Sequence, residues 1–143
     1  MSSHQFSTFR VDGRLYGVSV KIVQEITKPM PITAVPLSPD FVKGLINLRG
    51  QIATAIGIRE LFKLGAQVDV DRNVNVVCKV DGLLLSLIVD EIGDVIEVDD
   101  KDFEETPDTI SLHVAQFMNG VYKLPDNILS ILDINKLVSF LNQ

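Results

Sequence analysis

Short segments in which apolar and polar residues alternate predict β-strands along most of the chain. The first is followed by Asp12-Gly13, a dipeptide that readily supplies the positive φ angles of a tight hairpin turn. Arg49-Gly50 marks another turn, between an apolar strand and one in which isoleucines alternate with small residues. In the first half of the chain we expect strands over 6–11, 16–20, 42–48 and 52–58.

The same pattern recurs in the second half. Val11-Asp12-Gly13 aligns with Val80-Asp81-Gly82, 69 positions further on. At the same shift, Val23-Gln24-Glu25-Ile26 aligns with Ile92-Gly93-Asp94-Val95. Later in each copy the shift becomes 76 positions, and the difference falls in connecting segments, where insertions cost little. This collinear match indicates two copies of one β-rich unit.

Each copy is expected to end in a short helix. The helix over Arg59–Leu64 would end at Gly65, a favourable residue just after a helix C-terminus. Asp133 can cap a C-terminal helix over Ile134–Leu141. We predict an all-β protein of two small barrel lobes packed together, in one domain over 1–143. Lobe one is expected at about 14–75 and lobe two at about 76–143, with an N-terminal strand that the two can share.

Composition narrows the possible partners. The 143 residues are 46% hydrophobic, and the formal net charge is −6 with no block of Lys or Arg. The chain can therefore bury a core, but it lacks the basic footprint that nucleic acids or anionic membranes require. The N-terminus has no secretory signal, and no apolar run reaches the roughly 18 residues of a membrane span. We expect a cytoplasmic protein in which Cys78 is a buried free thiol.

No catalytic, cofactor-binding or metal-binding residues are predicted, so the chain is not expected to be an enzyme. The acidic stretch over 97–105 lacks the ligand spacing of a calcium loop. His113 lies near Ser111 and Asp108, but no nucleophile elbow accompanies them. Two histidines and one cysteine make a zinc site implausible. An enzyme on a small barrel and a nucleic-acid-binding barrel are the alternatives that these observations disfavour.

Three segments carry a more specific signal: Tyr16-Gly17-Val18, Val23-Gln24-Glu25-Ile26 and the stretch from Lys43 to Gly50, which contains G-x-x-N-L-R-G. In these segments, and in order over nearly the whole chain, the sequence resembles the CheW family of bacterial chemotaxis coupling proteins. The resemblance implies two five-stranded SH3-like barrels joined through a shared hydrophobic core. It also implies an adaptor, without cofactor, that couples the cytoplasmic hairpin tips of chemoreceptors to the histidine kinase CheA.

The resemblance further implies how the partners assemble. The regulatory domain of CheA has the same fold, and the two can pair through opposite lobes into rings beneath the inner membrane, whereas the isolated chain is expected to be a monomer. Thr54 and Gly57 depart from the family, which commonly carries Pro and Asp there. These departures leave a second interpretation open: an auxiliary CheW-like or CheV-like scaffold that serves a different receptor and kinase.

Seven residues are candidates for receptor binding on the family pattern, and simpler interpretations stay open for each. Arg49 can be a solvated turn residue or form a local ion pair, and Asn47 can bond local backbone. Lone valines are more often core residues. A groove for an amphipathic receptor helix would form at the seam between the lobes. The seven candidates are Val23, Glu25, Val35, Asn47, Arg49, Ile88 and Val89.

The kinase contact would need exposed aliphatic residues at the ends of the barrels. Val11, Gly44, Leu45 and Val98 are the candidates, and ordinary loop packing is the alternative for each of them.

Overall fold

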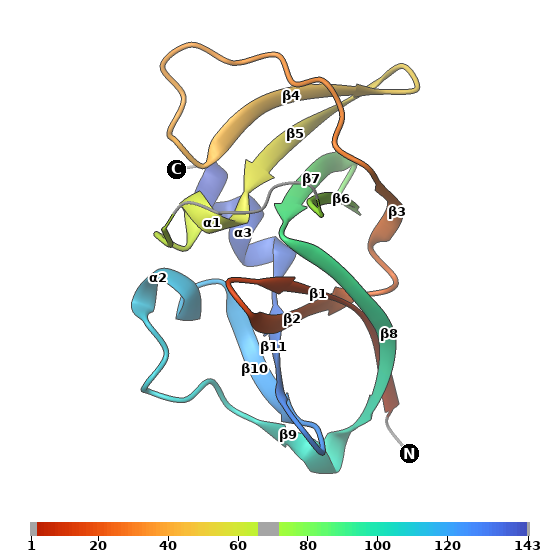
Figure 1. Ribbon diagram of the computed structural model, residues 1–143, viewed down its shortest axis with the longest axis vertical. Coiled ribbons are helices and arrows are strands. Elements are labelled where there is room, and N and C mark those ends of the chain that lie inside the picture. The colour runs from red at the N-terminus through yellow and green to blue at the C-terminus, as the bar shows by residue number, and fades with distance from the viewer. Residues whose placement is uncertain (1–2, 66–71, 143) are drawn as a thin grey trace.

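The computed structural model describes residues 3–65 and 72–142. The chain forms two curled β-sheets, one above the other along the longest axis of the molecule (Figure 1). Helices are short and lie beside the sheets. The strands are β1 Ser3–Val11, β2 Arg14–Ser19, β3 Val23–Thr27, β4 Val42–Leu48, β5 Gln51–Gly57, β6 Val74–Val80, β7 Leu83–Val89, β8 Glu91–Asp99, β9 Phe103–Glu104, β10 Met118–Lys123 and β11 Ile128–Leu132. The helices are α1 Ile58–Leu61, a 3₁₀ turn η1 Asp100–Asp102, α2 Leu112–Ala115 and α3 Ile134–Leu141.

The six-stranded sheet has the order β8-β1-β2-β11-β10-β9, and the five-stranded sheet has the order β3-β6-β7-β5-β4. The mostly β architecture, with a C-terminal helix, confirms the predicted fold class. In each sheet one parallel pair joins strands from the two halves of the chain: β2 with β11, and β5 with β7. All the other pairs are antiparallel. The two-residue β9 makes the first sheet one strand larger than the five expected.

The two copies of the repeat exchange their first hairpins. The β1–β2 hairpin lies between β8 and β11, which belong to the second copy. In return, the β6–β7 hairpin lies between β3 and β5 of the first copy. The sheets therefore divide the chain differently from lobes at about 14–75 and 76–143. After its second strand, each copy crosses directly from one sheet to the other, at Val20–Ile22 and at Asp90.

A shared hydrophobic core joins the sheets. Phe9, Val18, Ile56 and Leu87, all fully buried, belong to one cluster that draws on strands of both sheets and on the three helices. Phe62 of the turn after α1 continues this cluster and packs with Tyr16, their ring centroids 5.3 Å apart. Because each lobe covers an apolar face of the other, neither sheet has to be stable alone.

Local chemistry fixes the predicted turns and the last helix. Asp12 and Gly13 have φ angles of 54° and 76°, and Asp81 and Gly82 have 50° and 81°, as the Asp-Gly hairpins require. The Asp133 carboxylate accepts hydrogen bonds from the first-turn N–H groups of α3, which confirms the predicted cap.

The helix expected over Arg59–Leu64 is shorter than predicted. It ends at Leu61, and the left-handed residue that follows is Lys63 (φ 60°) instead of Gly65. The backbone N–H groups of residues 62–64 donate to the carbonyls of residues 58–60, and Lys63 has the left-handed conformation that closes these bonds. The helix therefore ends one turn earlier than predicted. In the part of the chain that the structure describes, no helix is long and apolar enough to cross a membrane.

Candidate partner-binding surfaces

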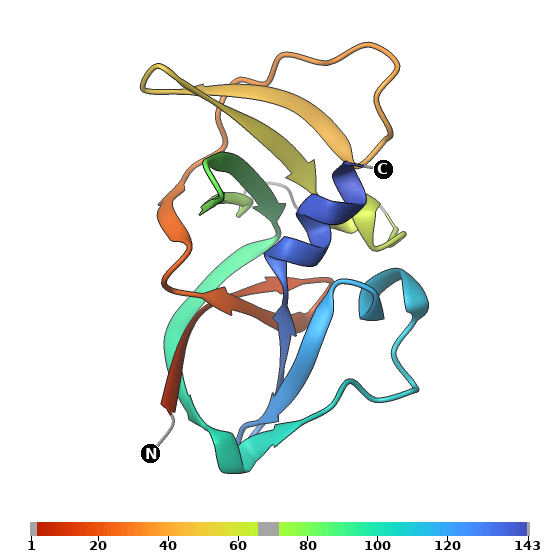
Figure 2. The ribbon, with the colours of Figure 1, turned by 180° about the vertical axis from the view of Figure 1, so that it is seen from behind.

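The seam between the sheets is flanked by two edge strands with exposed apolar side chains. β3 is at one edge of the five-stranded sheet and β8 is at one edge of the six-stranded sheet. Both views place them on the same side of the molecule (Figures 1 and 2). Ile26 on β3 is 42% exposed, and Ile92 and Val95 on β8 are 40% and 60% exposed. We call Val23, Ile26, Ile92 and Val95 the seam face.

The repeat relates the two halves of the seam face. Val23 and Ile26 align with Ile92 and Val95 at the shift of 69 positions, and each pair lies on the strand that follows a crossover between sheets. Sequence reasoning selected Val23 but missed the other three. The signal was present, because an apolar position that recurs in both copies on equivalent edge strands predicts a surface with local two-fold character.

Arg49 and Glu25 connect the β4–β5 turn to β3. Arg49 has a φ angle of 52° in the turn, its side chain is 74% exposed, and its guanidinium forms an ion pair with the Glu25 carboxylate. The Asn47 side-chain carbonyl accepts a hydrogen bond of 2.9 Å from the Gly50 N–H. Thus Asn47 shapes the turn, as its structural interpretation predicts, and Arg49 lies at the surface beside the strand that carries Ile26.

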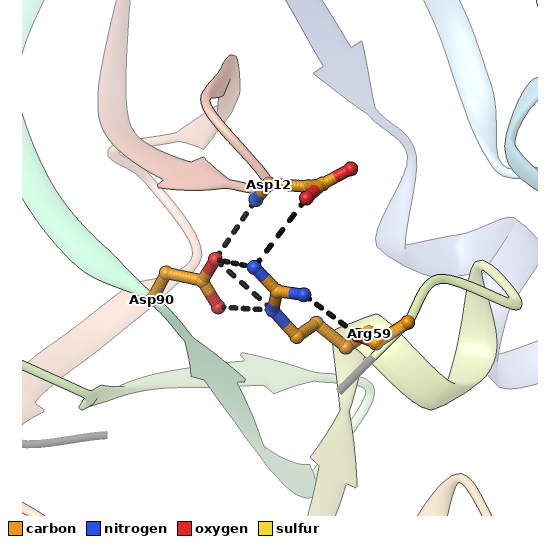
Figure 3. Close-up of polar contacts among 4 residues, drawn as sticks. Asp12, Arg59 and Asp90 are labelled. Carbon is orange, nitrogen blue, oxygen red and sulfur yellow. Dashed lines mark hydrogen bonds and ion pairs between the residues drawn. The ribbon is translucent and has the colours of Figure 1, made fainter. Parts of the chain in front are cut away.

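Arg59 forms a second ion pair at the junction of the two sheets, which we call the clasp (Figure 3). Its Nη2 and Nε donate to the Asp90 carboxylate at 2.7 and 3.0 Å, and its Nη1 donates to the Gly65 carbonyl at 2.7 Å. Asp90 also accepts from the backbone N–H of Asp12 at 2.8 Å. The clasp therefore joins α1, the β7–β8 crossover and the tip of the β1–β2 hairpin.

Partial burial makes the clasp stronger than an ordinary surface ion pair. The side chains of Arg59 and Asp90 are only 18% and 15% exposed, and their contact is a two-point one. The hydrogen bonds to Asp90 raise the pKa of the Arg59 guanidinium above its usual value, against the opposing effect of burial. The Asp12 carboxylate lies 3.5 Å from the same guanidinium and adds to this effect.

The structure distributes the remaining receptor candidates among different environments. Val23 is half-buried against the shared core, and Val35 is 36% exposed in the segment between β3 and β4. Ile88 is half-buried, and Val89 is 1% exposed within the shared core. Val89 therefore presents almost no side-chain surface to a partner.

The kinase candidates are mostly covered. Val11 is fully buried in the shared core, and Val98 is 6% exposed inside the six-stranded sheet. Gly44 is buried, with a φ of 144°, and a Cβ there would overlap the Thr33 carbonyl. Leu45 is half-buried, and its backbone pairs with Thr33 through hydrogen bonds of 2.8 and 2.9 Å.

Exposed isoleucines instead mark the two ends of the molecule. Ile52 on β5 is 58% exposed beside the β4–β5 turn, and Ile128 on β11 is 51% exposed beside the β10–β11 turn. These residues align with each other at the shift of 76 positions. The two hairpins lie at opposite ends of the longest axis (Figure 1). The fold thus presents the same side chain at both ends.

Among the residues that the structure describes, no cluster of three His, Cys, Asp or Glu side chains could hold a metal ion. Cys78 is fully buried, as predicted, and burial raises the pKa of its thiol to about 12. A neutral, inaccessible thiol is a poor nucleophile. The apolar surfaces and ion pairs described above are suited to binding another protein.

Two curled sheets with exchanged hairpins and a shared core define a scaffold fold that known proteins share. The scaffolding protein TtCheW from Thermoanaerobacter tengcongensis has a solved structure that matches with a TM-score of 0.83 and 28% identity, over 92% of this chain and 89% of that one. The chemotaxis protein CheW of Treponema pallidum is 32% identical over 139 residues, which cover 94% of this chain and 82% of that protein. The chemotaxis protein CheW of Bacillus subtilis is 28% identical over 130 residues.

The CheW-like domain family matches residues 5–141, so the chain belongs to that family. It is a chemotaxis scaffold that couples receptors to the kinase CheA, and the family is one of non-enzymatic adaptors. The comparisons extend over nearly the whole described chain.

Proposed function

We propose that the chain performs this coupling through two separate surfaces: the seam face with Arg49 for the receptor tip, and the hairpin ends with Ile52 and Ile128 for the regulatory domain of CheA. The observation that carries the proposal is that the exposed apolar residues which recur in both copies lie in two places, Ile26, Ile92 and Val95 along the seam and Ile52 and Ile128 at the two hairpin ends. The two surfaces meet only at the β4–β5 turn, which carries both Arg49 and Ile52, and their other residues are on different strands, so that both partners can bind at once.

The seam face suits an amphipathic helix of the receptor tip. Ile26 and Val95 supply exposed apolar surface from two strands, and a helix lying along the seam could bury both with one apolar stripe. The Arg49–Glu25 pair at the edge of this surface would supply polar contacts to the helix, in keeping with the planar donors of arginine. Val35 is 36% exposed in the segment that follows β3, whereas Val89 is buried in the shared core.

The hairpin ends suit pairing with a domain of the same fold. A unit that presents equivalent surfaces at opposite ends can join two neighbours, and such head-to-tail contacts close into rings when the rotation permits. Ile52 and Ile128 are the exposed members, and Leu45 lies on the strand next to Ile52. Three kinase candidates are buried and would not touch the kinase themselves. They would affect this contact only by holding neighbouring exposed residues in place: Val11, Gly44 and Val98.

Calorimetry with two partner fragments tests this division. The full chain is titrated into a receptor hairpin-tip fragment and, separately, into a CheA regulatory domain. Val95→Asp and Arg49→Ala should weaken receptor binding at least about 10-fold and leave kinase binding unchanged. Ile52→Asp should do the reverse. Leu112→Asp is the matched control, because Leu112 is 82% exposed on α2, across the molecule from β3 and β8 (Figure 1).

The outcome distinguishes the coupling role from the placement of its surfaces. If the wild type binds both fragments but Val95→Asp weakens neither, the seam face is not the receptor site. If the wild type binds neither fragment, the chain serves another receptor and kinase pair, which is the auxiliary-scaffold alternative.

A further inference from the structure

The side of the molecule opposite the seam face carries almost no charge. Three segments lie there: residues 34–39 before β4, residues 110–120 with α2, and residues 134–142 with α3 (Figure 2). With histidine counted as neutral, Lys136 is the only charged side chain in these segments, although the whole chain has 13 basic and 19 acidic residues. Two chains that each have a net charge of −6 would repel each other least where these faces meet.

Two exposed leucines belong to these segments. Among the described residues, Leu37 and Leu112 are the most exposed large apolar residues, Leu37 fully and Leu112 at 82%. Each is in the connector that leads to a phenylalanine, and the two phenylalanines align at the shift of 76 positions. These residues, Phe41 and Phe117, both pack against Phe140 of α3, with ring centroids 5.5 and 5.1 Å from it. The two copies therefore present one exposed leucine each near α3.

An open recess of about 350 Å³ lies between the end of α2 and α3. Phe140 is half-buried and gives the recess apolar surface, and three exposed polar residues surround it. Lys136 also lines the recess, and its Nζ donates to the Met118 carbonyl at 2.7 Å. An apolar centre with a polar rim is the usual make-up of a contact between proteins. The lining residues are Gln116, Phe117, Asn135, Lys136, Ser139 and Phe140.

The helix α2 places Leu112 next to this recess. Leu112 is the first residue of α2, and Gln116 is the residue that caps its end. The Gln116 N–H donates to the Leu112 carbonyl at 3.2 Å, so the two residues are one helical turn apart. Side chains four positions apart lie on the same face of a helix. Leu112 therefore lies beside the recess that Gln116 lines, and one face of the molecule carries both a projection and a recess.

We propose that a second copy of this chain occupies this face, with Leu112 of each copy in the recess of the other across a two-fold axis. A face that carries a projection beside a recess is complementary to itself after a two-fold rotation, so each contact is made twice. The near absence of charge on the face favours a second copy over a strongly charged partner. A contact built on two leucines is smaller than the roughly 800 Å² per partner of a stable dimer, so we expect a dissociation constant on the order of 0.1–1 mM. The dilute chain is then a monomer, as the sequence analysis expects.

Measurements on the full-length chain alone test this pairing, so the result does not depend on the proposed receptor and kinase surfaces. Sedimentation equilibrium and two-dimensional amide NMR are recorded from about 0.05 to 1 mM protein. The fitted mass should rise toward that of a dimer. The backbone signals of Gln116, Asn135 and Ser139 should shift with concentration along one saturable curve, whereas those of β3 and β8 should not move.

Substitutions at exposed positions test the projection and the recess separately. Leu112→Asp removes the projection, and Ser139→Arg blocks the recess with a long charged side chain, so each should weaken pairing at least about 10-fold. Leu37→Asp is the matched control. Leu37 is also exposed, but its segment lies on the other side of α3 from α2 (Figure 2), so this variant should pair as the wild type does. Urea midpoints close to that of the wild type are expected for all three variants.

The possible outcomes decide between a second copy and other occupants of the face. A mass that stays monomeric up to about 1 mM overturns the proposal. Equal losses from Leu112→Asp and Leu37→Asp also overturn it, because exposed leucines would then associate without a defined site. Loss of receptor or kinase binding by Leu112→Asp, in the calorimetry described above, would assign the face to that partner instead.

Discussion

The interiors of the two sheets differ although the repeat makes their backbones equivalent. Inside the six-stranded sheet, Phe6 packs with Tyr122, their ring centroids 5.5 Å apart. Inside the five-stranded sheet the cluster is smaller, and the parallel β5–β7 pair carries alanines. The contrast is clear position by position: Phe6, Tyr122, Leu129 and Ile131 in one sheet correspond to Asn75, Ile46, Ala53 and Ala55 in the other.

This difference shows that duplicated lobes need to keep only the faces that join them. The shared core holds large apolar residues from both copies, because each copy needs the other there. The interior away from the junction is free to diverge. The interior of the six-stranded sheet is filled with aromatic side chains, whereas the five-stranded sheet has small residues, asparagine and serine groups without partners among the described residues, and a cavity at its end.

The largest effect on stability is expected when a large side chain inside the six-stranded sheet is shortened. Leu129 is fully buried, and Leu129→Ala should cost about 2–5 kcal/mol of unfolding free energy through lost burial and the space left behind. Its counterpart in the other copy is Ala53. The variant therefore places in the six-stranded sheet the small residue that the five-stranded sheet has at this position. Urea unfolding measures the change. A loss below about 1 kcal/mol would mean that this interior can collapse around the gap.

In the shared core, Cys78 is the counterpart of Phe9. Because only the cysteine can ionise, it should make the unfolding free energy depend on pH in the alkaline range. Burial raises the thiol pKa to about 12 from its usual value of 9.0. A folded-state pKa that lies above the unfolded one gives stability that is complete at low pH and is lost as pH rises. The unfolding free energy should therefore fall by about 1.4 kcal/mol per pH unit between pH 9 and 12. Urea midpoints of the wild type and Cys78→Ala, compared across this range, isolate the thiol, and parallel curves would contradict the prediction.

The next effect distinguishes the two Asp-Gly hairpins. The tip at Asp12 is held by the clasp, whereas the corresponding tip at Asp81 lies outside it. Asp90→Asn should cost about 1–3 kcal/mol, because it removes the carboxylate that is hydrogen-bonded to a mostly buried guanidinium and leaves only Asp12, 3.5 Å away, as its counter-charge. Hydrogen exchange should accelerate at Asp12 and not at Asp81. Asp126→Asn, at an exposed position, is the control. Equal acceleration at both tips would show that the clasp does not hold the first hairpin.

Sequence reasoning succeeded where the chemistry is local. The Asp-Gly turns and the Asp133 cap depend on adjacent residues, so their patterns determine them. The hairpin exchange was not predictable in this way, because it depends on which copy pairs with which strand across the fold. The clasp was missed for the same reason, since Arg59 and Asp90 meet only after both hairpins are in place.

The candidate site shows the same limit. The motif around Arg49 gave its surface position, but the burial of Val11 and Val89 could not be predicted from the motif. A valine in a short strand has the same local pattern whether its face meets solvent or the other lobe. The repeat could have predicted more of the surface, because it aligns the exposed residues Ile26 with Val95 and Ile52 with Ile128.

The smallest effect on stability is expected at Arg49, whose ion pair is more exposed than the clasp. Its guanidinium is 74% exposed, and solvent screens its ion pair with Glu25, so Arg49→Ala should change the unfolding free energy by no more than about 1 kcal/mol. Asp90→Asn should exceed this, although both variants remove one member of a single ion pair. Urea unfolding of the two variants in parallel makes the comparison. A larger loss for Arg49→Ala would mean that the β4–β5 turn depends on the Glu25 contact, and Arg49 would then be a structural residue whose effect on receptor binding follows from the turn.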